Sequence, residues 1–203
     1  MTQSDASVHD WKNPPSDWAE EQARRTALEI RRLRGKRSAQ WLADRTEELG
    51  YAVSRSVISD LEVGRRRYVT TSELLIIARA LNVFPIALMY PAPYDEPIEA
   101  LPNSANKMVK ILAVQWFLGG MRPEDVKSLF GGDVDEIKQN ATRLDLAYRL
   151  YHLEGELRDG QAILSEGILK PGSSEEGFIR SQLSELQSQI ARLRSEIAEL
   201  NGR

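Results

Sequence analysis

The chain has 203 residues, of which 41% are hydrophobic and 28% are charged, a composition typical of a globular protein with many exposed helices. No apolar run approaches the ~20 residues of a membrane span, which argues against an integral membrane protein. Cysteine is absent, which excludes disulfides and thiolate chemistry and agrees with a reducing compartment. The first residues are polar and acidic, unlike a secretory signal, so we expect a cytoplasmic protein.

The net charge of −3 hides an uneven distribution of charge along the chain. Residues 20–90 carry 13 Lys or Arg and 9 Asp or Glu, a net charge of +4, whereas residues 91–203 carry 13 and 18, a net charge of −5. Three consecutive arginines, Arg65, Arg66 and Arg67, lie in the basic part. This distribution indicates that one part of the chain approaches a polyanion, with solvated helix faces as the alternative explanation.

The first predicted elements are a flexible arm and a helix. Residues 1–17 contain two consecutive prolines, which cannot continue a helix, so we expect a flexible arm there. Ser16 or Asp17 can cap a helix over about residues 18–33, where apolar side chains recur at helical spacing. Gly35 is expected to end this helix.

Four more short helices are predicted before residue 90, because capping residues precede apolar positions at helical spacing. The residues expected to start them are, in order, Ser38, Ser54, Thr70 or Thr71, and Pro85. The five helices define a predicted domain over residues 18–90. Four prolines within residues 91–103 then indicate a linker, which we take as the domain boundary.

Beyond the linker the sequence indicates further helices and no strand-like alternation, so we predict an all-α fold. Residues 104–165 are expected to form a helical middle module that ends in a long helix. The long helix has two adjacent apolar stripes. The first comprises Ile137, Ala141, Leu144, Tyr148 and Tyr151, and the second comprises Leu146, Leu150, Leu153 and Leu157.

The last predicted helix, within residues 175–203, carries a coiled-coil seam. Its apolar residues alternate spacings of four and three and are Ile179, Leu183, Leu186, Ile190, Leu193, Ile197 and Leu200. The order of Ile and Leu favours a parallel pair of helices, so we predict a homodimer that forms through this seam. The alternative is a hairpin in which the helix folds back, antiparallel, on the long helix of its own chain.

Three stretches of the basic part match a known pattern: SAQWLA at residues 38–43, SRSVISDLEVGRR at residues 54–66 and LLIIARALNV at residues 74–83. In this order they resemble the lambda-repressor/Cro-type (XRE) helix-turn-helix family, over about a third of the chain, residues 23–90. The resemblance implies a five-helix DNA-binding domain whose helix 55–63 enters the major groove. It implies a sequence-specific transcriptional regulator, and we predict a repressor.

The helix at residues 55–63 must turn one face into the core and present the other to base edges. The core face consists of Val57, Ile58 and Leu61. The base-reading candidates are Arg55, Ser56, Ser59 and Asp60. Arg55 can bond guanine N7 and O6, or instead a phosphate, and Asp60 can accept from cytosine N4, or instead form an ion pair within the protein.

Other side chains are expected to contact the DNA backbone. These candidates are Ser38, Gln40, Ser54, Arg65, Arg66 and Arg67. The three arginines follow the reading helix in a loop, where they would supply affinity rather than sequence choice. The helix that starts after Ser38 can hold a phosphate on its free N–H groups. Glu62 matches a glutamate of the family pattern, and the resemblance implies a structural role for it.

Two features depart from the family pattern. Many members have a glutamine at the position of Ala39, and here Gln40 lies one position further, so the family's phosphate contact does not transfer directly to Gln40. Ten residues separate Ala43 from Ser54, where the family has about five. We expect the first motif helix to gain about one turn before a longer connection at residues 50–53, so that the reading helix docks at an unusual angle.

No catalytic or metal-binding arrangement stands out in the sequence. His9 and His152 are the only histidines, and no metal-ligand set follows without cysteine. We therefore expect no enzymatic activity, no cofactor and no metal, and a location on the nucleoid when the protein is bound to double-stranded DNA. Three functions remain open: a dimeric regulator, a monomeric DNA binder with a C-terminal protein-interaction module, and an adaptor that does not bind DNA. Arg55 and the arginine loop argue against the adaptor.

Overall fold

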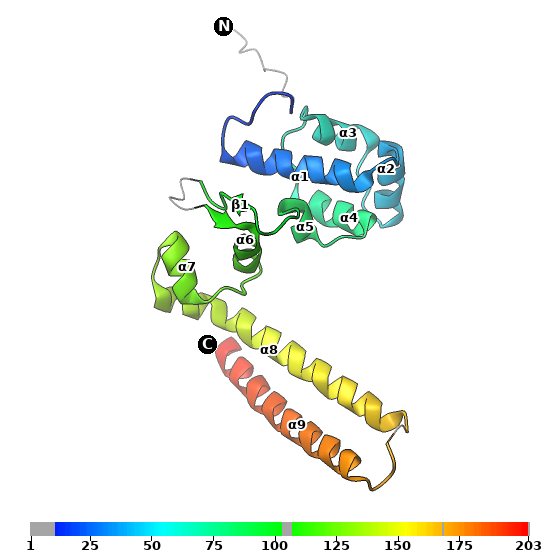
Figure 1. The fold of residues 1–203 in the computed structure, drawn as a ribbon, viewed down its shortest axis with the longest axis vertical. Helices are drawn as coiled ribbons and strands as arrows, with labels where there is room; N and C mark the ends of the chain where they lie inside the picture. The colour runs from blue at the N-terminus through cyan, green and yellow to red at the C-terminus, as the bar shows by residue number, and fades with distance from the viewer. Residues whose placement is uncertain (1–10, 103–106, 168, 203) are drawn as a thin grey trace. The chain divides into compact units, whose positions relative to one another are not determined.

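Helices dominate the part of the chain that the computed structural model describes, residues 11–102, 107–167 and 169–202 (Figure 1). These described residues form nine helices and one two-stranded sheet, which confirms a mostly helical fold. Contacts between them define two units, residues 1–118 and 119–203. None of the helices in the described part is long and apolar enough to cross a membrane.

The first unit contains the five predicted short helices. They are α1 (Trp18–Arg34), α2 (Ala39–Glu48), α3 (Arg55–Val63), α4 (Thr71–Leu81) and α5 (Pro85–Met89). The capping side chains are Asp17, Ser38, Ser54 and Thr70, each of which accepts a hydrogen bond from an N–H group in the first turn. Glu73 completes a capping box at α4, because its carboxylate accepts from the backbone N–H of Thr70. Local capping chemistry therefore sets where these helices begin.

One apolar core holds the five helices together. Its large, fully buried residues are Ile30, Leu42, Ile58, Ile77 and Leu88, one from each helix, and each is at most 1% exposed. Burial of one such side chain contributes about 1.5–3 kcal/mol. Because every helix supplies a residue to the same core, the position of each helix depends on all the others.

A buried threonine fixes the long connection between α2 and α3. As predicted, α2 is extended and ends at Glu48, and Gly50 then adopts a left-handed backbone with φ of 91°. The hydroxyl of Thr46 donates to the carbonyl of Ala43 at 2.8 Å and accepts from the N–H of Val53 at 2.9 Å. The extra residues therefore lengthen the connection without loosening it.

The prediction of a flexible arm is wrong for its last residues. Trp11 is 8% exposed, and its backbone N–H donates to the carbonyl of Val63 at 3.2 Å. The consecutive prolines at positions 14 and 15 exclude a helix, but they do not exclude a fixed irregular segment. Residues 1–10, which include His9, lie outside the described residues.

The predicted linker at residues 91–103 includes ordered structure. There β1 (Pro97–Ile98) pairs antiparallel with β2 (Met108–Val109), and α6 (Lys110–Phe117) follows directly. Ile98 and Met108 face each other across this pair and are buried. A two-residue strand is too short to show an alternating pattern in the sequence, which explains why no strand was expected.

The boundary between the two units lies after Leu118, so its prediction within the prolines was wrong. Lys110 illustrates why this region belongs to the first unit, because its ammonium donates to the carbonyl of Pro91 at 3.0 Å and to the carboxylate of Glu96 at 2.8 Å. The predicted middle module at residues 104–165 is therefore divided between the two units. Prolines indicate breaks in helices, and here they fall inside a folded loop rather than between domains.

The second unit consists of α7 (Pro123–Phe130), α8 (Val134–Ser165) and α9 (Ser174–Asn201). The last two helices lie side by side and run in opposite directions (Figure 1). Two contacts record this antiparallel pairing: Arg194 forms an ion pair with Glu154 at 2.7 Å, and the guanidinium of Arg143 donates to the carbonyl of Leu200 at 3.0 Å. The unit is thus a long helical hairpin with one short helix before it.

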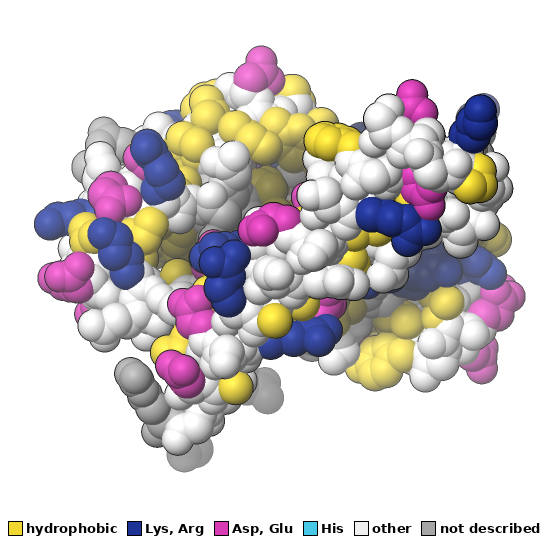
Figure 2. Space-filling view, turned by 90° about the horizontal axis from the view of Figure 1, so that it is seen from below, with side chains coloured by type: hydrophobic (Ala, Val, Ile, Leu, Met, Phe, Trp, Pro, Cys, Tyr) yellow, Lys and Arg dark blue, Asp and Glu magenta, His cyan; other side chains and the backbone are white. Residues whose placement is uncertain are grey.

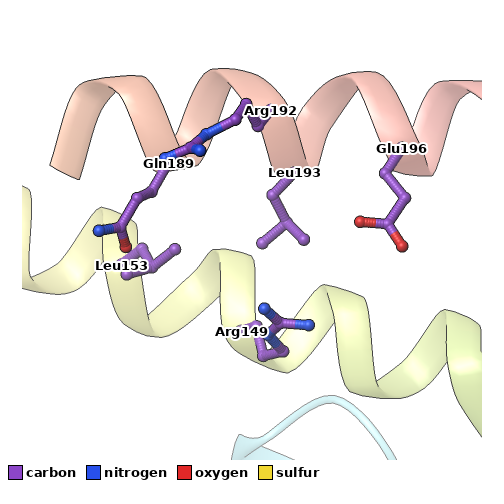
Figure 3. A pocket seen from close by; sticks show the side chains of 6 residues that line it. All are labelled: Arg149, Leu153, Gln189, Arg192, Leu193 and Glu196. Carbon is purple, nitrogen blue, oxygen red and sulfur yellow. The ribbon is translucent and has the colours of Figure 1, made fainter. Parts of the chain in front are cut away.

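The coiled-coil seam of α9 is occupied by α8 of the same chain, in the antiparallel hairpin that was the alternative, and the parallel pairing of two chains stays a prediction. Leu183, Ile190 and Leu193 are buried, and the half-buried seam residues are Ile179, Leu186, Ile197 and Leu200. Figure 3 shows Leu193 pointing from α9 toward α8. A Cβ on Gly160 of α8 would lie 2.6 Å from Leu183 Cδ2, so this glycine leaves room for the leucine. Heptad spacing reveals a seam but not which helix fills it.

Of the two apolar stripes on α8, only the second faces α9. Leu146 belongs to the second stripe and is 3% exposed. Three residues of the first stripe, Leu144, Tyr148 and Tyr151, are between 46% and 65% exposed. The hairpin thus uses one stripe for its own stability and leaves much of the other in contact with solvent.

Candidate nucleic-acid interface

Helix α3 is short, well capped and fixed in the core by one face. The hydroxyl of Ser54 accepts from the N–H of Val57 at 3.3 Å, and Gly64 ends the helix in a left-handed conformation with φ of 89°. Ile58 and Leu61 are 0% and 2% exposed. These contacts orient the opposite face of the helix outward.

The outward face carries the predicted base-reading residues. Arg55 and Ser56 are exposed, and Ser59 and Asp60 are half-buried. The hydroxyls of Ser54 and Ser56 lie 2.9 Å apart, which holds Ser56 near the helix start. Within the described part of the chain, the Arg55 guanidinium forms no hydrogen bond or ion pair. Its donors are therefore available to a ligand at the surface.

Asp60 forms the ion pair that was the alternative to base contact. Its Oδ1 lies 2.7 Å from both Nε and a terminal nitrogen of Arg65. Both side chains are more than a third exposed, so the pair contributes little stability. It does, however, direct the carboxylate toward the loop and partly neutralise Arg65.

The other two loop arginines are also paired with carboxylates. Arg66 bonds both oxygens of Glu73 on α4, at 2.7 and 2.9 Å. Arg67 lies 2.7 Å from the buried carboxylate of Glu20 on α1. Burial alone would raise the pKa of Glu73, but hydrogen bonds from Thr70 and Arg66 outweigh it and hold that pKa below its usual value. The loop is therefore tied to α1, α3 and α4, and its positive charge is largely offset.

A bidentate ion pair joins α3 to α1. The guanidinium of Arg34 bonds both carboxylate oxygens of Glu62, each at 2.6 Å, and both side chains are mostly buried. The hydrogen bonds to Glu62 raise the pKa of Arg34, so the guanidinium stays charged. The geometry agrees with the structural role that the sequence resemblance implied for Glu62.

The start of α2 presents polar groups to solvent. Ser38 and Gln40 are exposed, Ser38 Oγ accepts from Trp41 N at 3.0 Å, and the amide of Gln40 donates to Asp44 at 2.7 Å. Arg37 was not among the predicted site residues. Its guanidinium stacks 3.9 Å above the Trp41 ring and donates to backbone carbonyls at the end of α1. A basic residue just before a helix cap was the signal that could have identified it.

The remainder of the described chain offers less convincing sites. A cavity of about 580 Å³ in the second unit is lined by Arg122 and Lys138, among others, but these cations pair with Asp125 and Glu124. No cluster of three or more metal-ligating side chains occurs in the described residues. Figure 2 shows Lys and Arg side chains interspersed with Asp and Glu on one face of the molecule, rather than a surface of one sign.

No protein-family model, curated protein or solved structure matches the chain. The comparisons therefore identify no family and no relative from which a function could be transferred. The features that bear on function are the arrangement of α2, α3 and the arginine loop.

Proposed function

We propose that the protein is a sequence-specific DNA-binding transcriptional regulator that reads the major groove with α3. The observation that carries the proposal is the combination of a well-anchored α3 with an exposed Arg55 at its start, which has no hydrogen-bond or ion-pair partner among the described residues. An α-helix with its side chains is about 10–12 Å wide, and the major groove is about 12 Å wide. The first turn of a helix in the groove is the part that reaches base edges.

The residues have distinct roles in this proposal. Arg55 donates two hydrogen bonds to guanine, and Ser56 and Ser59 supply short polar contacts to neighbouring bases. Asp60 is engaged with Arg65, so we assign it to the support of the loop rather than to base recognition. Ser38, Gln40 and Arg37 at the start of α2 provide contacts to the DNA backbone, which position the protein without reading sequence.

The proposal is tested by selecting bound sequences from random double-stranded DNA and then measuring affinity at several salt concentrations. We expect an enriched motif and an affinity that falls as salt rises, because phosphate contacts release counterions. Absence of an enriched motif together with salt-independent binding would contradict the proposal.

Substitution of Arg55 tests its assigned role. Arg55→Ala should cost about 1–3 kcal/mol in binding to the preferred sequence and relax the preference at one base position. Arg79→Ala is the matched control, because it removes the same charge from an exposed position on α4, where Arg79 bonds Asn82. An equal loss on all sequences, or an equal effect of Arg79→Ala, would contradict base reading by Arg55.

The number of chains on the DNA is a separate part of the proposal. The seam that we expected to join two chains is filled by α8 of the same chain, which favours binding by a single chain. An asymmetric footprint is then expected, whereas a palindromic footprint with half-sites about one helical turn apart would require a homodimer that forms through another surface. Light scattering of the same sample gives the number of chains directly.

The sign of regulation is a further part of the proposal, and we propose repression. It is measured with a reporter gene placed behind the selected site.

A further inference from the structure

Trp11 contacts the carboxyl end of α3 from a segment that lies outside the five-helix domain predicted from the sequence. Its backbone N–H donates to the carbonyl of Val63 at 3.2 Å, and its indole N–H donates to the carbonyl of Leu61 at 2.8 Å. The side chain is largely buried, with 8% exposure. A tryptophan more than forty positions away in the sequence therefore holds the end of the reading helix.

These contacts satisfy groups that α3 cannot satisfy by itself. The last four carbonyls of an α-helix have no partner within the helix. Gly64 N–H serves the carbonyls of Asp60 and Leu61, and Trp11 supplies the donor for Val63 and a second donor for Leu61. A helix of nine residues is shorter than the ~12–15 that an isolated helix needs to be stable in water, so α3 depends on such contacts.

Gly64 makes the approach of Trp11 possible. Its φ of 89° is a left-handed conformation that favours glycine, and a Cβ there would lie 2.7 Å from Trp11 N and 2.9 Å from Trp11 Cδ2. The glycine that ends α3 is thus also the surface on which the tryptophan lies. Helix termination and the docking of Trp11 are properties of the same residue.

A second contact ties the same segment to the arginine loop. Glu20, which is 3% exposed, lies 2.7 Å from Arg67 and accepts from the backbone N–H of Ser16 at 2.7 Å. Residues 11–16 are therefore attached at one end to the carboxyl end of α3 and at the other, through Glu20, to the loop that follows it. We call residues 11–16, which the Glu20 carboxylate holds at Ser16, the strap.

We propose that the strap fixes the orientation of α3 on DNA and that Trp11 is a positioning residue for sequence recognition. The inference rests on the proposed DNA-binding function. Hydrogen bonds to base edges are directional and need an exact helix position, whereas contacts with phosphates tolerate small shifts. Loss of Trp11 therefore reduces discrimination between sequences more than it reduces binding to DNA in general.

The test compares Trp11→Phe with Trp18→Phe. Each variant removes one indole N–H that bonds a backbone carbonyl, but Trp18 bonds Glu99 O at 3.0 Å, away from α3. Affinity is measured for the enriched sequence and for a scrambled sequence of the same composition. Trp11→Phe should lower the ratio of the two affinities about tenfold, the scale of one lost hydrogen bond, and Trp18→Phe should leave the ratio unchanged. An equal loss on both DNAs, or equal effects of the two variants, would overturn the proposal.

Hydrogen exchange without DNA keeps this inference separate from the proposed function. Amides of α3 should exchange faster in Trp11→Phe than in Trp18→Phe and the unaltered protein, and Glu20→Gln should act in the same direction by weakening the other end of the strap. If the unaltered protein selects no DNA sequence while the exchange result holds, the proposed function fails and the strap remains. If exchange in α3 is the same in all four proteins, the proposed role of the strap is overturned, whatever the result of the DNA-binding measurements.

Discussion

The five-helix core and the α8–α9 hairpin bury their apolar residues in different ways. In the core, each of α1 to α5 contributes a fully buried residue to one cluster. In the hairpin, two helices share a single linear seam, whose best buried α9 residues, Ile190 and Leu193, are 5% exposed. A shared cluster couples all of its helices, whereas a seam couples neighbouring turns. The orientation of α3 is therefore a property of the whole domain, while the hairpin can open locally.

The largest expected effect comes from removing a central side chain of the five-helix core. Ile58→Ala should lower the free energy of unfolding of the first unit by about 2–5 kcal/mol, because Ile58 is fully buried in the shared cluster and its loss leaves a cavity there. Urea denaturation followed by circular dichroism measures this loss. Leu75→Ala on α4 is the control, since Leu75 is 53% exposed and its loss should matter by less than about 0.5 kcal/mol. Similar values for the two variants would argue against a shared core.

A seam substitution should have a smaller and more local effect. Leu193→Ala should destabilise the hairpin by about 2 kcal/mol, the low end for a leucine, because the seam is open to water along its sides. Hydrogen exchange should accelerate in α8 and α9 and stay unchanged in α1 to α5. Leu144→Ala is the matched control, as Leu144 lies on α8 and is 47% exposed. Equal acceleration in both units would show that they unfold together, contrary to local opening of the hairpin.

Acid should lower the stability of the first unit through Glu73, and this is the smallest of the three expected effects. The pKa of Glu73 is lowered in the folded protein, so its stabilising contribution is present above the unfolded pKa of about 4.3 and is lost as pH falls through the lower folded value. Glu73→Gln should cost about 1 kcal/mol at pH 7, the usual scale of a helix cap, and progressively less as the pH falls below the unfolded pKa of about 4.3. Urea denaturation at a series of pH values from 7 downward measures the difference. A cost for Glu73→Gln that does not change with pH would show that the carboxylate charge contributes nothing.

Local features of the sequence predicted the five helices, whereas contacts between residues distant in the sequence could not be predicted. Ser38, Ser54 and Thr70 identify helix starts because a cap acts within three or four residues of itself. The docking of Trp11 on α3 and the pairing of Arg67 with Glu20 join positions about fifty apart, and no spacing rule encodes such contacts. For the same reason the heptad pattern of α9 left two partners open, a second chain and α8 of the same chain.

The outward residues of α3 were also predictable, and the state of their neighbours was not. The spacing of Ile58 and Leu61 defines the inner face and so assigns Arg55 to the other side. An arginine run looks equally basic in a sequence whether or not carboxylates lie beside it. Only the folded arrangement pairs Arg66 with Glu73 and leaves Arg55 without a partner in the described chain.

The pairing of the loop arginines affects how such a protein would divide its time among the many sites of a long DNA. A cation that is already neutralised by a carboxylate displaces few counterions, so it adds little to the attraction that holds proteins on arbitrary sequence. Competing sites on a genome are numerous enough that this background attraction decides how many molecules are free to find the right one. Because the loop arginines are paired with carboxylates of the protein itself, their attraction to arbitrary DNA sequence would be weak. Arg55 would then contribute a larger share of the total binding free energy.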